Sequence, residues 1–133
     1  MHLIDTNIII WILRGEKTYL DLKRSLKKES ILYISTITVA EVYKNVYPVE
    51  MVKTDEILSE FELINVTDTI AKLAGLYWQQ FIKKFKNLNI LDCIIAATAR
   101  EYDLTLVTLN SRHFPMNDIS ILDPVRKMRQ KSS

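Results

Sequence analysis

Two hydrophobic patterns alternate along this chain of 133 residues. The first is a short run of consecutive apolar residues, such as "ILYIS" at 31–35 and "LTLVT" at 104–108. Such runs are typical of strands that are covered on both faces. The runs predict strands at residues 2–5, 31–35, 62–66, 104–108 and 119–123.

The second pattern is amphipathic, with apolar residues three or four positions apart among charged ones, which indicates helices. Residues 8–13 are too short a run for periodicity to decide, but Asn7 as an N-cap and Gly15 as a stop favour a helix there. Pro48 suits a first helical turn, and Asp68 is a suitable N-cap. We expect helices at residues 8–13, 17–29, 36–46, 48–61, 68–84 and 90–102.

The alternation of strands with helices predicts an α/β sandwich with a mainly parallel sheet. The sequence has no internal repeat and no Pro/Gly-rich linker, so we expect one domain over residues 1–125, followed by a basic tail at 126–133. In such folds the ligand site lies beyond the carboxyl ends of the strands. Polar residues at that edge of the sheet are therefore the candidates for a functional site.

Composition supports a globular protein, because 48% of the residues are apolar and 26% are charged. The single cysteine, Cys93, cannot form an internal disulfide, which favours a reducing cytoplasm, and its apolar setting predicts a core residue. No stretch reaches the roughly 18 apolar residues that a membrane span needs. Asp5 interrupts the apolar start, which we interpret as mature structure and not as a signal peptide.

The net charge of +2 is small, but the basic residues are clustered. The three clusters are Lys23, Arg24, Lys27 and Lys28; Lys83, Lys84 and Lys86; and Arg126, Lys127, Arg129 and Lys131. Basic patches of this kind suit a polyanion such as RNA. The alternative for each cluster is a solvated helix face or a frayed terminus.

Three acids lie near the predicted carboxyl ends of the strands, where a ligand site is expected. Asp5 ends the first strand, Glu41 lies early in the helix after the second, and Asp92 lies in the first turn of helix 90–102. Thr108 and Asn110 follow strand 104–108 at the same edge. Each acid also has a structural explanation: a turn at Asp5, a capping box that joins Thr38 to Glu41, and a favourable dipole position for Asp92.

The surroundings of the acids weaken these separate explanations. Asp5, Glu41 and Asp92 each interrupt a very apolar stretch, and no basic residue lies next to them there. Burying an unpaired carboxylate costs several kcal/mol. A divalent cation removes the problem, because clustered carboxylates are the usual ligands of Mg²⁺ or Mn²⁺.

Four segments then resemble a known family. They are "LIDTN" at 3–7, "AE" at 40–41, "LDCIIAATAREYDLTLVTLNSRHF" at 91–114 and "ISILDP" at 119–124. They are similar to the PIN-domain ribonucleases, and most of all to the VapC-like toxins of toxin–antitoxin pairs. The resemblance implies a three-layer α/β/α sandwich and runs from Leu3 to about Pro124.

The resemblance also implies roles for individual residues. Asp5, Glu41 and Asp92 match the family's three principal acids, which bind one or two Mg²⁺ or Mn²⁺ ions. Thr108 matches a hydroxyl residue that supports the first acid, and Asn7 matches a polar residue that helps to order the site.

One position departs from the family pattern. Where many members carry a fourth acid, this chain has His113, with Asn110 nearby; Asp118 is a less suitable substitute because it lies further along the loop. We therefore expect one firmly held ion in preference to two. Arg112 is a candidate phosphate contact, with an idle loop arginine as the alternative.

By resemblance we expect a metal-dependent endoribonuclease, held inactive by a cognate antitoxin, that forms a homodimer. The alternative is a non-catalytic RNA-binding or scaffold module on the same fold, and DNA is a possible substrate in place of RNA. Rival chemistries lack support, because the sequence has no Gly-rich nucleotide loop, and His2 and His113 are too few for a typical zinc site.

Overall fold

The structure is a computed structural model that describes residues 1–126 and 128–132, apart from the side chain of Met128. Lys127 of the predicted basic tail lies outside the described residues. The strands in this part of the chain are β1 (His2–Ile4), β2 (Leu32–Ser35), β3 (Glu62–Ile64), β4 (Thr105–Val107), β5 (Ile121–Leu122) and β6 (Met128–Arg129). The α-helices are α1 (Thr6–Leu13), α2 (Lys17–Glu29), α3 (Thr36–Tyr43), α4 (Met51–Leu58), α5 (Asp68–Phe81) and α6 (Ile90–Glu101).

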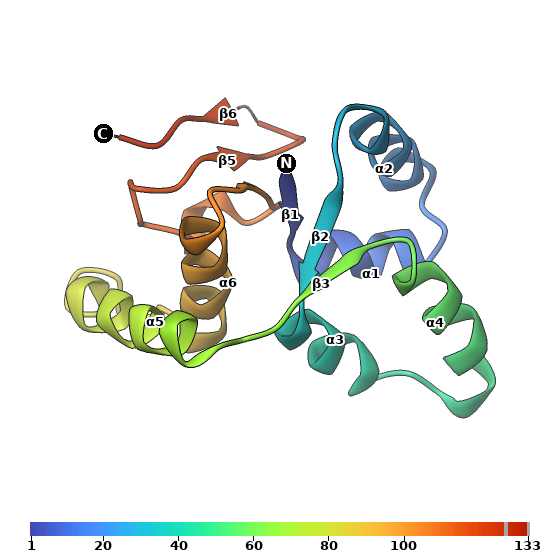
Figure 1. Cartoon of the computed structure of the whole chain (residues 1–133), viewed down its shortest axis with the longest axis horizontal. Helices are drawn as coiled ribbons and strands as arrows, with labels where there is room; N and C mark the ends of the chain where they lie inside the picture. The colour runs from blue at the N-terminus through green and yellow to red at the C-terminus, as the bar shows by residue number, and fades with distance from the viewer. Residues whose placement is uncertain (127, 133) are drawn as a thin grey trace.

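The strands form one sheet in the order β3-β2-β1-β4-β5-β6. The first five pair in parallel, and β6 adds to β5 in antiparallel (Figure 1). The strand order reverses between β1 and β4, which makes this pair the switch point of the sheet. The mainly parallel sheet predicted from the hydrophobic pattern is confirmed, whereas β6 was not predicted.

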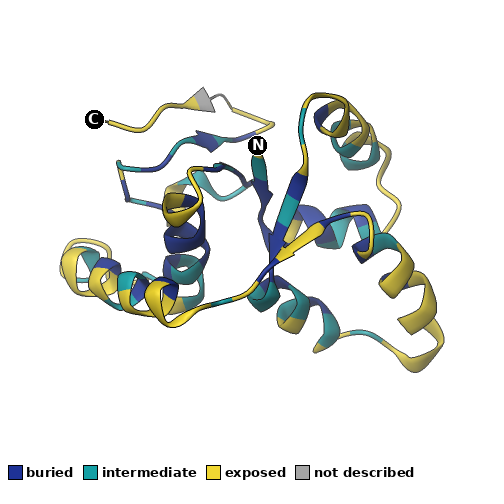
Figure 2. Cartoon of the chain, viewed as in Figure 1, coloured by how far each residue is buried: buried dark blue, intermediate teal, exposed yellow. Residues whose placement is uncertain are grey.

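Helices cover both faces of the sheet, with α5 and α6 on one face and α1 and α2 on the other (Figure 1). Neighbouring strand residues point to opposite faces, so Leu3 joins the core under α5 and α6 while Ile4 joins the core under α1 and α2. Leu106 and Val107 divide in the same way. The result is the three-layer α/β/α sandwich that the family resemblance implies. Its central strands are buried, the edge strand β3 is largely exposed, and the outer sides of the helices are exposed (Figure 2).

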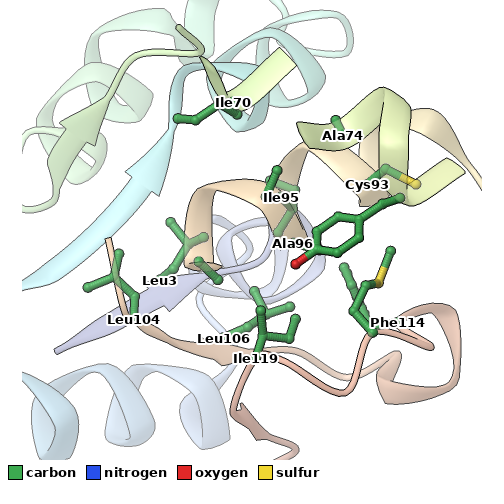
Figure 3. Packing of buried hydrophobic residues seen from close by; sticks show 14 of the residues in the cluster. Leu3, Ile70, Ala74, Cys93, Ile95, Ala96, Leu104, Leu106, Phe114 and Ile119 are labelled. Carbon is green, nitrogen blue, oxygen red and sulfur yellow. The ribbon is translucent and has the colours of Figure 1, made fainter. Parts of the chain in front are cut away.

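Cys93 is fully buried in the first of these cores, among apolar side chains of α5, α6 and the sheet (Figure 3). Burial raises the pKa of its thiol to about 11, so the reactive thiolate is suppressed. The prediction of a core cysteine is confirmed. No helix in the described ranges is long and apolar enough to cross a membrane.

The N-caps of α1 and α5 are not the residues predicted from the sequence. The N-cap of α1 is Asp5, whose side chain accepts from the backbone of Thr6, and Asn7 lies exposed inside the first turn. The N-cap of α5 is Thr67, one residue before Asp68, because its hydroxyl reaches the third helical amide. Gly15 does end α1, with a φ of +77°.

Three predicted helices are also shorter than expected. Helix α3 ends at Tyr43 and not at residue 46. The segment 48–61 is divided into a 3₁₀ turn, η1 (Pro48–Glu50), and the separate helix α4. Helix α5 ends at Phe81 and not at residue 84, and the chain then turns through residues 82–89 before α6 begins. That turn carries the whole of the second basic cluster, Lys83, Lys84 and Lys86.

Candidate active site

Asp5 lies at the switch point of the sheet, directly after β1. Its side chain is buried, and both carboxylate oxygens are held: the amide of Thr6 donates to Oδ1 at 2.8 Å, and the hydroxyl of Thr108 donates to Oδ2 at 2.7 Å. Thr108 follows the neighbouring strand β4, so the parallel pairing of β1 with β4 creates this contact. The orientation of the Asp5 carboxylate is therefore fixed from two elements.

Glu41 is brought to the same place by α3, which follows β2. The hydroxyl of Thr6 donates to Oε1 of Glu41 at 2.8 Å and lies 3.0 Å from the hydroxyl of Thr38. Thr38 is fully buried inside α3, and the N-cap of that helix is Ser35. The capping-box explanation for Glu41 is therefore wrong, because Thr38 is not a cap.

Thr6 and Thr38 were missed as site residues in the sequence. Their hydroxyls link the two acid-bearing elements α1 and α3. A signal did exist, since Thr6 adjoins Asp5 and Thr38 lies one helical turn before Glu41. A hydroxyl next to an acid in an apolar stretch is a candidate donor to that acid or to a neighbouring one.

Asp92 completes the group from the first turn of α6. The N-cap of this helix is Asn89, whose side chain accepts from the amide of Leu91, so capping does not occupy the Asp92 carboxylate. Burial raises the pKa of Asp92 to about 6, and repulsion from Asp5 and Glu41 adds to the rise while His113 opposes it.

Burial also raises the pKa of Asp5, and the negative charge of Glu41 contributes in the same direction. The hydrogen bonds from Thr108 and Thr6 act against this rise but do not cancel it. Asp5 and Asp92 thus resist ionisation, with Glu41 adding to the rise in the pKa of both. The structure therefore brings Asp5, Glu41 and Asp92 together at one edge of the sheet.

The fourth corner of the site is formed by the segment after β4. A 3₁₀ turn, η2 (Ser111–His113), places Nδ1 of His113 3.6 Å from Oδ2 of Asp92. The amide of Asn110 donates to the hydroxyl of Thr108 at 3.0 Å, so Asn110 contacts the site through its backbone. Arg112 is exposed on the same turn.

Asp118 does not replace the missing fourth acid. Its carboxylate accepts from the hydroxyl of Tyr77 at 2.8 Å and forms an ion pair with Arg100. These contacts link α5, α6 and the loop before β5, on the face covered by α5 and α6. Asp118 therefore has a structural role on that face, in agreement with the prediction that it is a less suitable substitute for the fourth acid.

A second buried acid, Asp123, supports the site from β5 and was not singled out in the sequence. Its Oδ2 accepts from the hydroxyl of Ser111 at 3.1 Å, and its Oδ1 accepts from the amides of Val125 and Arg126 at 3.0 and 3.2 Å. Asp123 thereby fastens η2 to the chain after β5. Arg129 of β6 adds two bonds, donating to the carbonyls of Phe114 and Met116 at 2.7 and 3.0 Å.

The donor set fits a hard divalent cation. Three carboxylates face one edge, and the pKa values of two are raised because burial and mutual repulsion disfavour their charged forms. Oxygen ligands of this kind suit Mg²⁺ or Mn²⁺. Among the described residues, no group of three or more His, Cys, Asp or Glu side chains is already positioned to hold a metal ion.

The first basic cluster lies elsewhere, on α2. Its lysines and arginine line a hollow of about 590 Å³ that shares no lining residue with the acids. Glu60 pairs with Lys23 at 3.2 Å and with Lys27 at 3.5 Å, so part of this positive charge is neutralised within the chain.

The chain is thus a three-layer α/β protein with carboxylates gathered at the switch point of its mainly parallel sheet. The PIN domain family matches residues 2–118, and the chain belongs to this family. Ribonuclease VapC10 of Mycobacterium tuberculosis is 34% identical over 116 residues, which is 87% of each chain. Ribonuclease VapC19 of the same species is 32% identical over 117 residues, covering 87% of this chain and 94% of the relative.

A solved structure shows the same likeness. A toxin–antitoxin complex from Klebsiella pneumoniae contains a chain that is 31% identical to this one, with a TM-score of 0.72. The match covers 86% of this chain and 91% of that chain. The relatives and the structure therefore agree with the family that the quoted sequence segments indicate.

Proposed function

We propose that this protein is a metal-dependent endoribonuclease that hydrolyses RNA phosphodiester bonds, and that it is the toxin of a VapBC-type toxin–antitoxin pair. The observation that carries the proposal is the convergence of Asp5, Glu41 and Asp92, each from a different element, on one edge of the sheet. The ribonuclease names of the relatives support the reaction and the substrate.

Asp5, Asp92 and Glu41 are the residues that would hold a Mg²⁺ or Mn²⁺ ion. Such an ion supplies a bound water of lowered pKa and neutralises negative charge that develops on the phosphate. Thr108 and Thr6 fix the two oxygens of Asp5 before any ligand arrives. Glu41, oriented by the hydroxyl of Thr6, either binds the ion or orients the attacking water.

The fourth corner favours one ion over two. His113 stands where an additional carboxylate would complete a second set of oxygen ligands, and it faces Asp92. Asn110 adds a side-chain amide nearby, which is neutral. With three carboxylates and, among the described residues, no fourth, the site offers hard oxygen ligands for a single divalent cation.

We also propose a protein antitoxin as the regulator of this site. The solved relative from Klebsiella pneumoniae is a toxin–antitoxin complex. An antitoxin arginine inserted among the three carboxylates would satisfy the same unmet need for positive charge that the cation satisfies. The alternative of a non-catalytic RNA-binding or scaffold module is less favoured, because dedicated donors orient the carboxylates of Asp5 and Glu41.

RNA cleavage by the wild-type protein and by Asp5→Asn tests the proposal. We expect cleavage of a mixed cellular RNA sample with Mg²⁺ or Mn²⁺, none with excess EDTA, and at least a hundredfold loss in Asp5→Asn. Glu101→Gln, which changes an exposed acid at the end of α6, is the matched control and should cleave normally. Metal-independent cleavage, or equal activity in Asp5→Asn, would refute the metal site.

A further inference from the structure

A small hollow adjoins the acidic edge and is not explained by metal binding. It lies between the turn that joins α5 to α6 and the 3₁₀ turn η2, and its volume is about 270 Å³. One of its walls is Asp92 itself. The other residues that matter here are Phe85, Lys86, Asn87, Arg112 and His113.

The hollow has an aromatic wall. Phe85 is 38% exposed, although an isolated phenylalanine side chain is normally buried. It meets Phe81 with ring centroids 6.4 Å apart and an interplanar angle of 64°, so the two rings are not stacked face to face. Lys84 lies over the ring at 5.9 Å from its centroid, at the outer limit of a cation–π contact.

The backbone holds the aromatic ring at the hollow. The amide of Phe85 donates to the carbonyl of Phe81 at 2.9 Å, and the amide of Leu88 donates to the carbonyl of Phe85 at 3.0 Å. Leu88 packs against the core under α5 and α6, which anchors the turn. The turn therefore presents Phe85, Lys86 and Asn87 together on its outer side.

The hollow also has a cationic wall. Lys86 and Arg112 are exposed, come from different turns and both line it. Neither belongs to any ion pair within residues 1–126 and 128–132 as the structure describes them. Two cations beside a candidate metal-binding carboxylate provide a place for a phosphate.

We propose that this hollow binds one nucleotide of the RNA strand, next to the phosphodiester that is cut. Its base stacks on Phe85, its phosphate contacts Arg112 and Lys86, and the amide of Asn87 is available to the edge of the base. The volume is close to the lower end of the range for small-ligand pockets, about 300 Å³, which suits a single nucleotide. The identity of the strand as RNA rests on the proposed function.

This arrangement makes the hollow a determinant of sequence preference. Arg112 and Lys86 contact groups that every nucleotide carries, so they contribute affinity without selection. Stacking on Phe85 favours bases with larger π-faces, and the Asn87 side chain, which has both an acceptor and donors, favours a base edge that presents a donor beside an acceptor. A preference at one nucleotide position follows.

Mononucleotide binding tests the proposal without cleavage. The four nucleoside 5′-monophosphates are titrated into the ¹⁵N-labelled full chain in EDTA, with ribose 5-phosphate as the probe that lacks a base. We expect amide shifts confined to residues 85–89 and 111–114, with purine nucleotides binding more tightly than ribose 5-phosphate. Shifts located elsewhere, or equal binding of all five probes, would overturn the proposal.

Variants separate the two walls of the hollow. Phe85→Leu keeps the apolar bulk and removes the ring, so nucleotide binding should weaken about tenfold while ribose 5-phosphate binding is unchanged. Phe85→Tyr restores the ring and should bind nucleotides like the wild type. Arg112→Gln should weaken both classes of probe. Tyr47→Leu, at an exposed aromatic position that is not in the lining of the hollow, is the matched control.

Failure of the nucleotide site and failure of the proposed nuclease function give different experimental results. If the wild type binds nucleotides here and cleaves no RNA, the nuclease proposal fails and the nucleotide site stands. If the wild type cleaves RNA while Phe85→Leu keeps the same KM and the same cleavage pattern, the nucleotide site fails and the nuclease proposal stands. If Phe85→Leu changes the oligomeric mass of the protein in solution and leaves nucleotide binding unchanged, this face belongs to a homodimer interface instead.

Discussion

The hydroxyl of Thr108 donates to Oδ2 of Asp5 at 2.7 Å, across 103 residues of sequence. The same hydroxyl accepts from the amide of Asn110 at 3.0 Å, so its single proton is directed to the acid. The contact exists because β1 and β4 are neighbours at the point where the strand order reverses. One buried threonine thereby sets the direction of the carboxylate on which the proposed chemistry depends.

Removal of this hydroxyl should affect activity more than stability. Thr108→Val keeps the shape of the side chain but leaves Oδ2 of Asp5 without its donor and the Asn110 amide without its acceptor. Each lost partner costs about 1–3 kcal/mol when buried. We expect a free energy of unfolding lower by about 2 kcal/mol and RNA cleavage slower by at least tenfold, measured by urea unfolding and by single-turnover assays.

Two further variants make this result specific. Thr108→Ser restores the hydroxyl and should recover most of the activity. Thr98→Val removes another buried hydroxyl, one that donates to the carbonyl of Ile94 within its own helix, and should leave cleavage unchanged. Equal loss of activity in Thr98→Val and Thr108→Val would mean that general destabilisation explains the effect.

The raised pKa of Asp92 predicts how stability depends on pH in the absence of metal. Burial and the nearby acids move its pKa from 3.8 to about 6 in the folded state. The folded protein therefore holds a proton that the unfolded chain has released, so the contribution of Asp92 to stability is fully present below about pH 4 and is lost as the pH rises through about 6. The change amounts to roughly 3 kcal/mol, since each pKa unit corresponds to about 1.4 kcal/mol.

Asp92→Asn should abolish this pH dependence along with activity. In EDTA the variant should match the wild type near pH 4 and become more stable than the wild type by roughly 2–3 kcal/mol at pH 8. The measurement is the free energy of unfolding from pH 4 to 8, with Mn²⁺ added in a parallel series to restore the wild type. Parallel curves for the two proteins in EDTA would show that Asp92 is not the group responsible.

Asp118 should prove to be a structural acid. Its partners are the hydroxyl of Tyr77 and the guanidinium of Arg100, and Tyr77 is buried. Asp118→Asn should lower the free energy of unfolding by about 1–2 kcal/mol and leave the cleavage rate and Mn²⁺ affinity of the folded protein unchanged. A loss of Mn²⁺ affinity, measured by calorimetry at a temperature where the variant is folded, would place Asp118 in the metal site.

Much of the fold can be predicted from local pattern because burial on both faces of the sheet requires short apolar strands. The five parallel strands and the alternating helices are recovered in this way. Strand β6 is missed because its two residues, Met128 and Arg129, carry no strand signal; backbone pairing with β5 and the two bonds from Arg129 hold it there. Tertiary contacts decide this element.

In the candidate site, too, local sequence patterns reveal some residues and tertiary contacts reveal the others. Asp5, Glu41 and Asp92 are conspicuous in the sequence because each interrupts an apolar run, which is a local signal. Their supporting residues Thr6 and Thr38 are not conspicuous, because a threonine in a helix is ordinary until the partner across 35 residues of chain is known. The hydrogen bonds of Thr6 with Glu41 and Thr38 are the part that only the fold supplies.

His113 provides a way to test how many ions the site holds. Its Nδ1 lies 3.6 Å from Oδ2 of Asp92, at the corner where a fourth acid is absent. His113→Asp places a second carboxylate at that corner, which supplies an additional hard oxygen ligand. We expect wild type to bind one Mn²⁺ and the variant to bind two, measured by calorimetric titration of the metal-free proteins.

Without metal, the His113→Asp substitution should lower the stability of the protein. A new negative charge beside Asp92 raises the pKa of that carboxyl further, because two like charges at short range disfavour joint ionisation. Metal-free His113→Asp should therefore be less stable than wild type at pH 8 and recover when Mn²⁺ is added. Asn117→Asp, an exposed substitution in the following loop that adds a negative charge away from the acids, should change neither property. Two Mn²⁺ ions in the wild type, or one in His113→Asp, would show that the residue at this corner does not set the metal count.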